Sequence, residues 1–353
     1  MKIVVLGGGI STERHVSLVT ATSACKALRS LGHQAVFVDM FLGLADYDKP
    51  LEEAFLEPDG LCGNASIGKT APDLEAVRMQ RGADCRGRLG KNVLEICKLA
   101  DCVFLGLHGA DGEDGKIQAA LELLSIPFTG SGSQASAIAM DKSVAKRIAV
   151  SYGILTPEWK EYTYKESDID RLSEKTEVPC VVKIVNGGSS IGVVLTETEE
   201  ELRKALKSVL AYGNHIIVEK KITGREITVP VLDGKALSPI EIIPPDGETF
   251  DYVAKYQSGK DGAAEICPAD LTEKEESMLR ERAEYVHQSL GLRVYSRSDF
   301  ILDADGKAWF LEVNTLPGMT PNSLIPKAAA VEGLSYAELC DSIVKLSLEE
   351  KRE

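Results

Sequence analysis

The chain has 353 residues, which is enough for two or three domains with sizeable buried cores. Its composition is 44% hydrophobic and 27% charged, which is ordinary for a globular protein and excludes a collagen-like or wholly disordered chain. Lys and Arg number 40 against 54 Asp and Glu, a net charge of −14. This balance argues against nucleic acid or an anionic membrane as a partner, because both require a basic surface.

The cysteines and the N-terminus predict a cytoplasmic protein. None of the eight cysteines forms a CxxC pair, and several lie in apolar runs, as reduced and buried thiols do. The residues before the first glycines are too few for a signal peptide, and no apolar run approaches the roughly 18 residues of a membrane span. We therefore expect no membrane partner.

The first third of the chain alternates strand and helix. Apolar runs and helical spacing predict strand 2–6, helix 16–31, strand 34–39, strand 101–107, helix 116–124 and a short strand 127–129. A strand–helix–strand start is typical of an α/β layer with a parallel sheet. Residues 41–90 are rich in Gly, Pro, Asp and Arg, and we expect a long, mostly irregular insertion there.

The remainder predicts two further units. In order, they are expected to contain a helix in 131–153 that runs through Asp141-Lys142, strands 180–185 and 193–196, helix 197–211, strand 215–219, strands near 225–232 and 236–243, a polar loop 246–264, helix 272–290, a hairpin 294–313 and C-terminal helices. The predicted fold is α/β, with α+β character in the C-terminal part. The expected domains are 1–129, 130–219 and 220–353.

The hairpin predicts a metal site. Asp305-Gly306 is typical of a two-residue turn with positive φ at both positions. Pairing the strands around that turn places four polar residues on one face: Arg297 opposite Asn314, and Asp299 opposite Glu312. Opposed carboxylates repel each other unless a cation lies between them, and two carboxylates with an amide oxygen suit Mg²⁺. A solvated acidic edge of the sheet is the alternative at this point.

A glycine-rich loop predicts a phosphate site. Residues 186–192 join two predicted strands and contain three glycines and two serines, so backbone N–H groups can approach an anion. Lys183 lies inside the apolar strand before this loop. Because a lysine is rarely buried without a partner, an anionic ligand is implied, and Lys142 is a second candidate cation. A flexible turn beside a snorkelling lysine is the alternative.

A second glycine-rich segment matches the P-loop pattern. Residues 63–70 read GNASIGKT, with Lys69 in the phosphate-binding position. No apolar strand enters this segment, and Pro72 would fall in the first turn of the helix that the motif requires. We treat the match as chance, and a P-loop module that uses Lys69 is a competing hypothesis.

Nine motifs occur in order over nearly the whole chain. They are GGGISTERHVS (7–17), LHGADGEDG (107–115), MDK (140–142), Lys183 with GGSSIG (187–192), VEK (218–220), GRE (224–226), FDYVAKY (250–256), RSD (297–299) and EVNTLPGMTPNSL (312–324). In this order they resemble the D-alanine–D-alanine ligases of the ATP-grasp superfamily. The resemblance implies an N-terminal α/β substrate domain followed by a two-part ATP-grasp fold.

The resemblance implies an ATP site with two divalent ions. Lys142 and Lys183 would hold the phosphates, residues 219–222 would read adenine, and Glu226 would bind the ribose. The ATP-binding residues implied are Lys142, Lys183, Ser190, Glu219, Lys220, Ile222, Glu226 and Lys255. The Mg²⁺ or Mn²⁺ ligands implied are Asp299, Glu312 and Asn314.

The resemblance also implies sites for two D-alanines. Glu13 would pair with the ammonium of the first, and His108 and Arg297 would stabilise the acyl phosphate and the tetrahedral intermediate. The residues expected to receive the second D-alanine are Gly318, Ser323 and Leu324, together with Lys255. Hydrogen bonds from Ser189 and Tyr256 would link to Glu13 and bring a mobile loop, roughly 246–264, over the site.

The implied activity is ATP-dependent ligation of two D-alanines through an acyl phosphate, for peptidoglycan precursor synthesis, by a homodimer. Two relatives of this activity stay open, with D-serine or D-lactate as the second substrate. Tyr256 is the position associated with dipeptide formation and favours D-alanine. An ATP-grasp enzyme that acts on another carboxylate is a further alternative.

Overall fold

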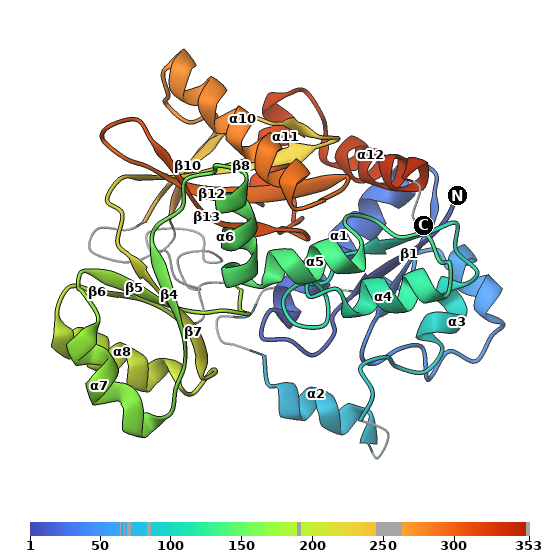
Figure 1. The fold of residues 1–353 in the computed structure, drawn as a ribbon. Coiled ribbons are helices and arrows are strands. Elements are labelled where there is room, and N and C mark those ends of the chain that lie inside the picture. The colour runs from blue at the N-terminus through green and yellow to red at the C-terminus, as the bar shows by residue number, and fades with distance from the viewer. Residues whose placement is uncertain are drawn as a thin grey trace.

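The computed structural model describes residues 1–63, 65–66, 68, 72–82, 86–188, 192–244 and 263–350. Its strands form three separate sheets, and Figure 1 shows their helices around them. Several residues singled out from the sequence lie outside the described part: Lys69, Ser189, Ser190, Lys255 and Tyr256. Most of the predicted polar loop 246–264 lies outside it as well.

The first sheet is parallel, as predicted. It comprises β1 (Lys2–Gly7), β2 (Gln34–Asp39) and β3 (Cys102–Leu105) in the order β2-β1-β3. Helix α1 (Arg14–Ser30) packs on β1 and β2, and α4 (Lys116–Leu123) follows β3. The predicted strand at 127–129 is reduced to a single bridge between Val103 and Phe128.

The insertion 41–90 contains little regular structure, as expected. The described elements are a 3-10 helix η1 (Leu51–Leu56) and helix α2 (Leu74–Gln80), and α3 (Val93–Cys97) comes just after the insertion.

Seven of the eight cysteines lie in the described residues, and all seven are free thiols. Six of these seven are buried, as the apolar runs around several of them predict.

The predicted helix through Asp141-Lys142 is wrong, because two helices meet there. Helix α5 (Ser133–Met140) ends and α6 (Lys142–Ser151) begins at Asp141, whose φ of −83° and ψ of 99° are extended. The Asp141 carboxylate accepts a hydrogen bond of 2.9 Å from the Val144 N–H, so it caps the second helix. Lys142 is therefore the first residue of a helix rather than the middle of one.

The second sheet has four antiparallel strands in the order β4-β7-β5-β6. They are β4 (Trp159–Thr163), β5 (Cys180–Ile184), β6 (Val193–Thr196) and β7 (His215–Lys220), with 3-10 helix η3 (Glu166–Asp168) and helices α7 (Ile169–Lys175) and α8 (Glu199–Val209). Helix α8 packs on β5 and β6. The sequence analysis did not predict β4 or α7.

The third sheet is antiparallel and is covered by helices from two parts of the chain. Its strands are β8 (Arg225–Leu232), β9 (Lys235–Ala236), β10 (Ile240–Ile243), β11 (Ala264–Ile266), β12 (Tyr295–Leu302) and β13 (Ala308–Asn314). Helices α10 (Glu273–Ser289), α5 and α6 share one apolar core with β8, β9, β12 and β13. The C-terminal helices α11 (Leu324–Val331) and α12 (Tyr336–Glu349) instead join the core of the first sheet.

The hairpin of β12 and β13 has the predicted pairs but not the predicted turn. Arg297 lies opposite Asn314 and Asp299 opposite Glu312, as expected. The turn has three residues, 304–306, and of these only Gly306 has a positive φ, so the two-residue turn is wrong. The pairing shifts by one residue between Asp299 and Phe300, and this bulge restores the predicted register at the polar end.

The parallel sheet followed by antiparallel sheets confirms the predicted fold class. Each sheet draws its strands from one of the three predicted domains, with β7 ending one residue beyond its domain at Lys220. The domain boundaries themselves stay a prediction. Within the described ranges, no helix has both the length and the apolar character needed to cross a bilayer.

Candidate active site

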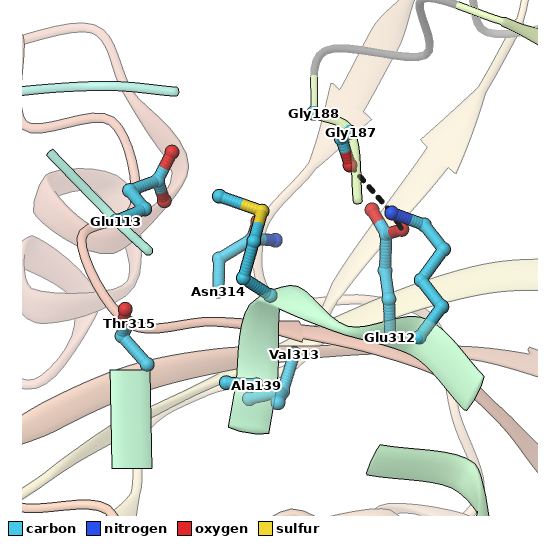
Figure 2. Close-up of a pocket in the computed structure, with 10 residues that line it drawn as sticks. Glu113, Ala139, Gly187, Gly188, Glu312, Val313, Asn314 and Thr315 are labelled. Carbon is cyan, nitrogen blue, oxygen red and sulfur yellow. Dashed lines mark hydrogen bonds and ion pairs between the residues drawn. The ribbon is translucent and has the colours of Figure 1, made fainter. Parts of the chain in front are cut away.

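One pocket collects residues from all three parts of the fold. The loop after β3, helices α5 and α6, the loop after β5 and strand β13 all reach it (Figure 2). It is lined by Glu113, Ala139, Met140, Lys142, Gly187, Gly188, Glu312, Val313, Asn314 and Thr315. The predicted metal hairpin and the predicted phosphate loop therefore face the same space.

Lys142 joins the hairpin to the glycine-rich loop. Its ammonium lies 3.1 Å from the Glu312 carboxylate and donates a 2.5 Å hydrogen bond to the Gly187 carbonyl oxygen. The lysine is buried, while Glu312 is partly exposed to the pocket. Because Lys142 begins α6, the helix break at Asp141 is what turns this side chain toward β13.

Lys183 has a protein partner. It lies on β5, diagonal to Glu219 on β7, and the two side chains form an ion pair at 2.7 Å. Burial alone would lower the pKa of Lys183, but Glu219 and Glu312 raise it above its ordinary value. The sequence argument inferred an anionic ligand from the burial of Lys183. Because Glu219 already supplies an anion, the burial by itself does not require a ligand.

Glu219 holds a second lysine. Its other carboxylate oxygen lies 2.9 Å from the ammonium of Lys146, which is completely buried. Burial alone would raise the pKa of Glu219, but Lys183 and Lys146 lower it below its ordinary value. Burial lowers the pKa of Lys146 to about 8, although Glu219 acts in the opposite direction. One buried carboxylate thus lies between two lysines.

The hairpin carboxylates suit a hard cation. The Arg297 guanidinium donates two hydrogen bonds, of 3.0 and 2.9 Å, to the Asp299 carboxylate, and the Thr228 hydroxyl donates a third of 2.5 Å. Each carboxylate thus already faces a positive group, Asp299 facing Arg297 and Glu312 facing Lys142. The described residues contain no cluster of three or more His, Cys, Asp or Glu, so the donor set here is two carboxylates and the Asn314 amide.

Glu13 reaches the glycine loop from the N-terminal domain. It is buried directly before α1, and its carboxylate passes so close to two glycines that a Cβ on Gly109 would lie 2.5 Å from it and one on Gly188 3.1 Å. Side chains at these two positions would displace the carboxylate. Glu13 therefore lies at the junction of the first sheet and the phosphate loop.

Glu113 is a site residue that the sequence analysis did not select. It lines the pocket and accepts a 2.7 Å hydrogen bond from the Gly109 N–H. Burial and then repulsion from Glu13 raise the pKa of Glu113 well above its usual range. Its position between two close glycines in the 107–115 motif was the available signal, because such spacing brings a backbone against a polar group.

His108 is buried and both ring nitrogens are engaged. Nδ1 lies 3.0 Å from the Leu316 carbonyl oxygen and Nε2 lies 2.9 Å from the Thr20 hydroxyl. Burial lowers the pKa of His108 to about 4, with a further lowering from Arg297. The ring is therefore neutral at pH 7, and any stabilising role must come from hydrogen bonding rather than a full charge.

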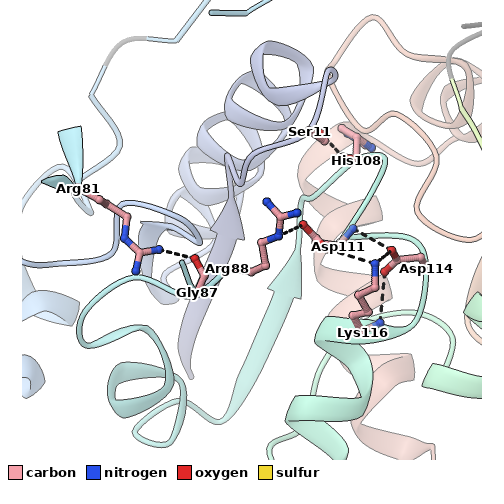
Figure 3. Close-up of polar contacts among 8 residues, drawn as sticks. All are labelled: Ser11, Arg81, Gly87, Arg88, His108, Asp111, Asp114 and Lys116. Atoms are coloured by element: carbon pink, nitrogen blue, oxygen red, sulfur yellow. Dashed lines mark hydrogen bonds and ion pairs between the residues drawn. The ribbon is translucent and has the colours of Figure 1, made fainter. Parts of the chain in front are cut away.

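The loop that carries His108 is fastened by the insertion 41–90. Arg88 forms an ion pair with the buried Asp111 at 3.0 Å, and Lys116 lies 3.3 Å from the same carboxylate (Figure 3). The Ser11 hydroxyl donates to the His108 carbonyl oxygen at 2.7 Å (Figure 3). One end of the insertion thus helps to fix the loop that carries His108 and Glu113.

The remaining predicted residues are not among those that line the pocket. Ser323 begins α11, and its hydroxyl accepts from the Thr320 N–H at 3.0 Å and would lie 3.1 Å from a Cβ on Gly318. Leu324 is the first residue of that helix and is half-buried. Of the residues expected to read adenine, Lys220 donates its backbone N–H to the Glu158 carbonyl oxygen at 2.8 Å, and Ile222 is half-buried. Glu226, expected to bind the ribose, lies on β8 and contributes to the raised pKa of Lys183.

A matched pair of histidines predicts part of the acid sensitivity. Burial lowers the pKa of His108 and of His287 to about 4, against an ordinary value of 6.5. Below about pH 6.5 these histidines become protonated in the unfolded chain but stay neutral in the folded chain. The free energy of unfolding therefore decreases as the pH falls from about 6.5 to about 4. In His108→Asn or His287→Asn, urea unfolding should show that loss reduced by about 3 kcal/mol. Only His108→Asn should also lose activity, and an unchanged pH dependence in both variants would contradict the burial argument.

Two family models match this chain, one in each half. The family model described as D-ala D-ala ligase N-terminus matches residues 2–131, and the model described as D-ala D-ala ligase C-terminus matches residues 148–345. A D-alanine–D-alanine ligase of Pediococcus pentosaceus is 40% identical over 98% of this chain and 97% of its own length. One from Neisseria gonorrhoeae is 39% identical over 98% and 97%.

Solved structures give the same result. The D-alanine–D-alanine ligase from Bacillus anthracis complexed with ATP superposes with a TM-score of 0.72 at 29% identity, covering 99% of this chain and 98% of that one. The enzyme from Coxiella burnetii gives 0.73 at 28% identity, covering 99% and 94%. With both family models matched in order and full-length relatives near 40% identity, this chain belongs to the D-alanine–D-alanine ligase family.

Proposed function

We propose that the protein uses ATP to join two D-alanines into D-alanyl-D-alanine, a peptidoglycan precursor. One observation supports this most strongly. Lys142 contacts both Glu312 of the hairpin and Gly187 of the glycine loop, so the groups suited to a metal and to a phosphate meet at one lysine. That arrangement suits transfer of a phosphoryl group, in which negative charge must be neutralised as it moves.

At the nucleotide end, Lys142 and Lys183 would hold the ATP phosphates and Glu219 would accept a hydrogen bond from the adenine amino group. Asp299, Glu312 and Asn314 would hold two Mg²⁺ or Mn²⁺ ions, which would shield the triphosphate and polarise the transferred group. When ATP enters, its phosphates compete with Glu312 for Lys142 and with Glu219 for Lys183. Both lysines therefore reach the ligand already oriented by carboxylates.

At the amino-acid end, Glu13 would pair with the ammonium of the first D-alanine. Arg297, a cation on β12 of the hairpin, would bind the carboxylate that becomes the acyl phosphate. Neutral His108 would donate one hydrogen bond to the developing oxyanion after releasing one of its present partners. The amine of the second D-alanine then attacks the acyl carbon and inorganic phosphate leaves.

The rest of the assignment rests on the family. Ser189 and Tyr256 would link to Glu13, Ser190 and Lys255 would contact ATP, and the loop 246–264 would exclude water from the acyl phosphate. Gly318, Ser323 and Leu324 would receive the second D-alanine, with Tyr256 favouring D-alanine over D-lactate or D-serine. The homodimer and the cytoplasmic location stay predictions.

A panel of second substrates tests the proposal. Purified protein should release phosphate from ATP only when D-alanine and Mg²⁺ are both present, because the acyl phosphate forms on D-alanine. Mass spectrometry of the products should show D-alanyl-D-alanine, with little mixed product when D-serine or D-lactate is added. Chelation of the metal should abolish phosphate release. Phosphate release with L-alanine but not D-alanine would point to an ATP-grasp enzyme for another carboxylate.

A further inference from the structure

The lysine behind Glu219 lies out of reach of any ligand. Lys146 is completely buried on α6, one turn after Lys142, and its ammonium is 2.9 Å from Glu219. We propose that Lys146 is a positioning residue that keeps Glu219 ionised and correctly aimed when Lys183 turns to the ATP phosphates. This inference rests on the proposed role of Glu219 as the acceptor for the adenine amino group.

Lys183 would be shared between two anions once ATP binds. It lies 2.7 Å from Glu219 in the structure, and the proposed function requires the same ammonium to bind phosphate oxygens. Glu219 is only 2% exposed, and without Lys146 its one remaining cation would be shared with the phosphates, which would favour the neutral, protonated form of the carboxyl group. A protonated carboxyl group lacks the negative charge that strengthens a hydrogen bond from the adenine amino group, and its O–H finds no acceptor on that group. A second cation that never leaves removes this conflict.

Lys146 is fixed in a way that suits this role. It donates a 2.5 Å hydrogen bond to the Thr156 hydroxyl, which in turn donates to the Phe310 carbonyl oxygen at 2.8 Å. Its ammonium also lies 5.5 Å from the ring centroid of Trp159, the residue paired with Glu219 between β4 and β7. Two hydrogen bonds and one ion pair thus connect Phe310 on β13, two residues before Glu312, to the Glu219 carboxylate on β7.

The test replaces Lys146 by methionine, which keeps the length of the side chain and removes its charge. The Michaelis constant for ATP should rise roughly 10- to 100-fold, as expected when a charged hydrogen-bonding partner is lost. The Michaelis constant for D-alanine should stay within about 2-fold, because Lys146 reaches no part of the amino-acid site. The preference for ATP over GTP should fall, since a protonated Glu219 can donate to the guanine O6.

Three companion variants decide the result. Lys160→Met, which removes an exposed lysine from β4 of the same sheet, should behave as wild type. Glu219→Gln separates the two claims. If it lowers the ATP preference and Lys146→Met does not, the positioning role is overturned while the function stands. If Glu219→Gln leaves the preference unchanged, the adenine-reading role fails and the inference fails with it.

Thr156→Val covers the case in which Lys146→Met does not fold. It keeps every charge and removes only the hydroxyl that anchors the ammonium. The Michaelis constant for ATP should rise roughly 5-fold, without a change for D-alanine. Equal Michaelis constants in Thr156→Val and wild type would overturn the proposal.

Discussion

Replacement of Glu312 by glutamine should lower the turnover number by about 10³-fold, because the variant loses one of the two carboxylates that face each other at the polar end of the hairpin while keeping the shape of the side chain. Glu312 lies opposite Asp299 across the hairpin, and it also orients Lys142 at 3.1 Å. The substitution therefore affects the metal and the phosphate-binding lysine together. Steady-state phosphate release, measured over a range of Mg²⁺ concentrations, checks this prediction.

Asp305→Asn is the matched control for Glu312→Gln. It removes one carboxylate from the same hairpin, but at the turn, where the side chain is exposed and pairs with Lys307. It should retain wild-type turnover and the wild-type dependence on Mg²⁺. Full turnover of Glu312→Gln at low Mg²⁺ would show that the hairpin is a solvated acidic edge, the alternative that the sequence leaves open.

The hairpin shows why the sequence predicted which residues face each other better than it predicted the shape of the turn. Alternation along a strand determines which side chains share a face, and this depends on parity rather than on the details of the turn. The real turn has three residues, and the one-residue bulge before Glu312 compensates for it. Nothing in the side chains of Phe310 and Leu311 marks a bulge at this place, so only the structure could reveal it.

Buried charges were harder to predict than the hairpin. Lys183 stood out because it interrupts an apolar strand, but its partner Glu219 is 36 positions away and is brought beside it by sheet pairing. Lys146 falls on the buried stripe of α6 with Lys142, Ala145 and Ala149, and that spacing was a usable signal. The unpredicted break at Asp141 obscured it, since a continuous helix would place the stripe differently.

Replacement of Lys183 by methionine should raise the Michaelis constant for ATP at least 100-fold and lower the turnover number by about 10³-fold, because the lysine would contact phosphate in both the ground state and the transition state. The protein should still fold. Breaking an isolated buried ion pair costs about 3–5 kcal/mol, but Glu219 retains Lys146 at 2.9 Å, so the loss of unfolding free energy should be smaller. Calorimetric ATP binding and urea unfolding measure the two effects separately.

Two further lysines give this prediction its contrast. Lys160→Met removes one positive charge, as Lys183→Met does, but at an exposed position of the same sheet, and it should leave ATP binding unaltered. Lys69→Ala tests the P-loop alternative at a position outside the described residues, and it should also bind ATP normally. Loss of ATP binding in Lys69→Ala with normal binding in Lys183→Met would transfer the phosphate site to residues 63–70. The buried Lys183–Glu219–Lys146 cluster would then be a structural feature of β5, β7 and α6, because two lysines on one carboxylate stabilise it whether or not a nucleotide binds.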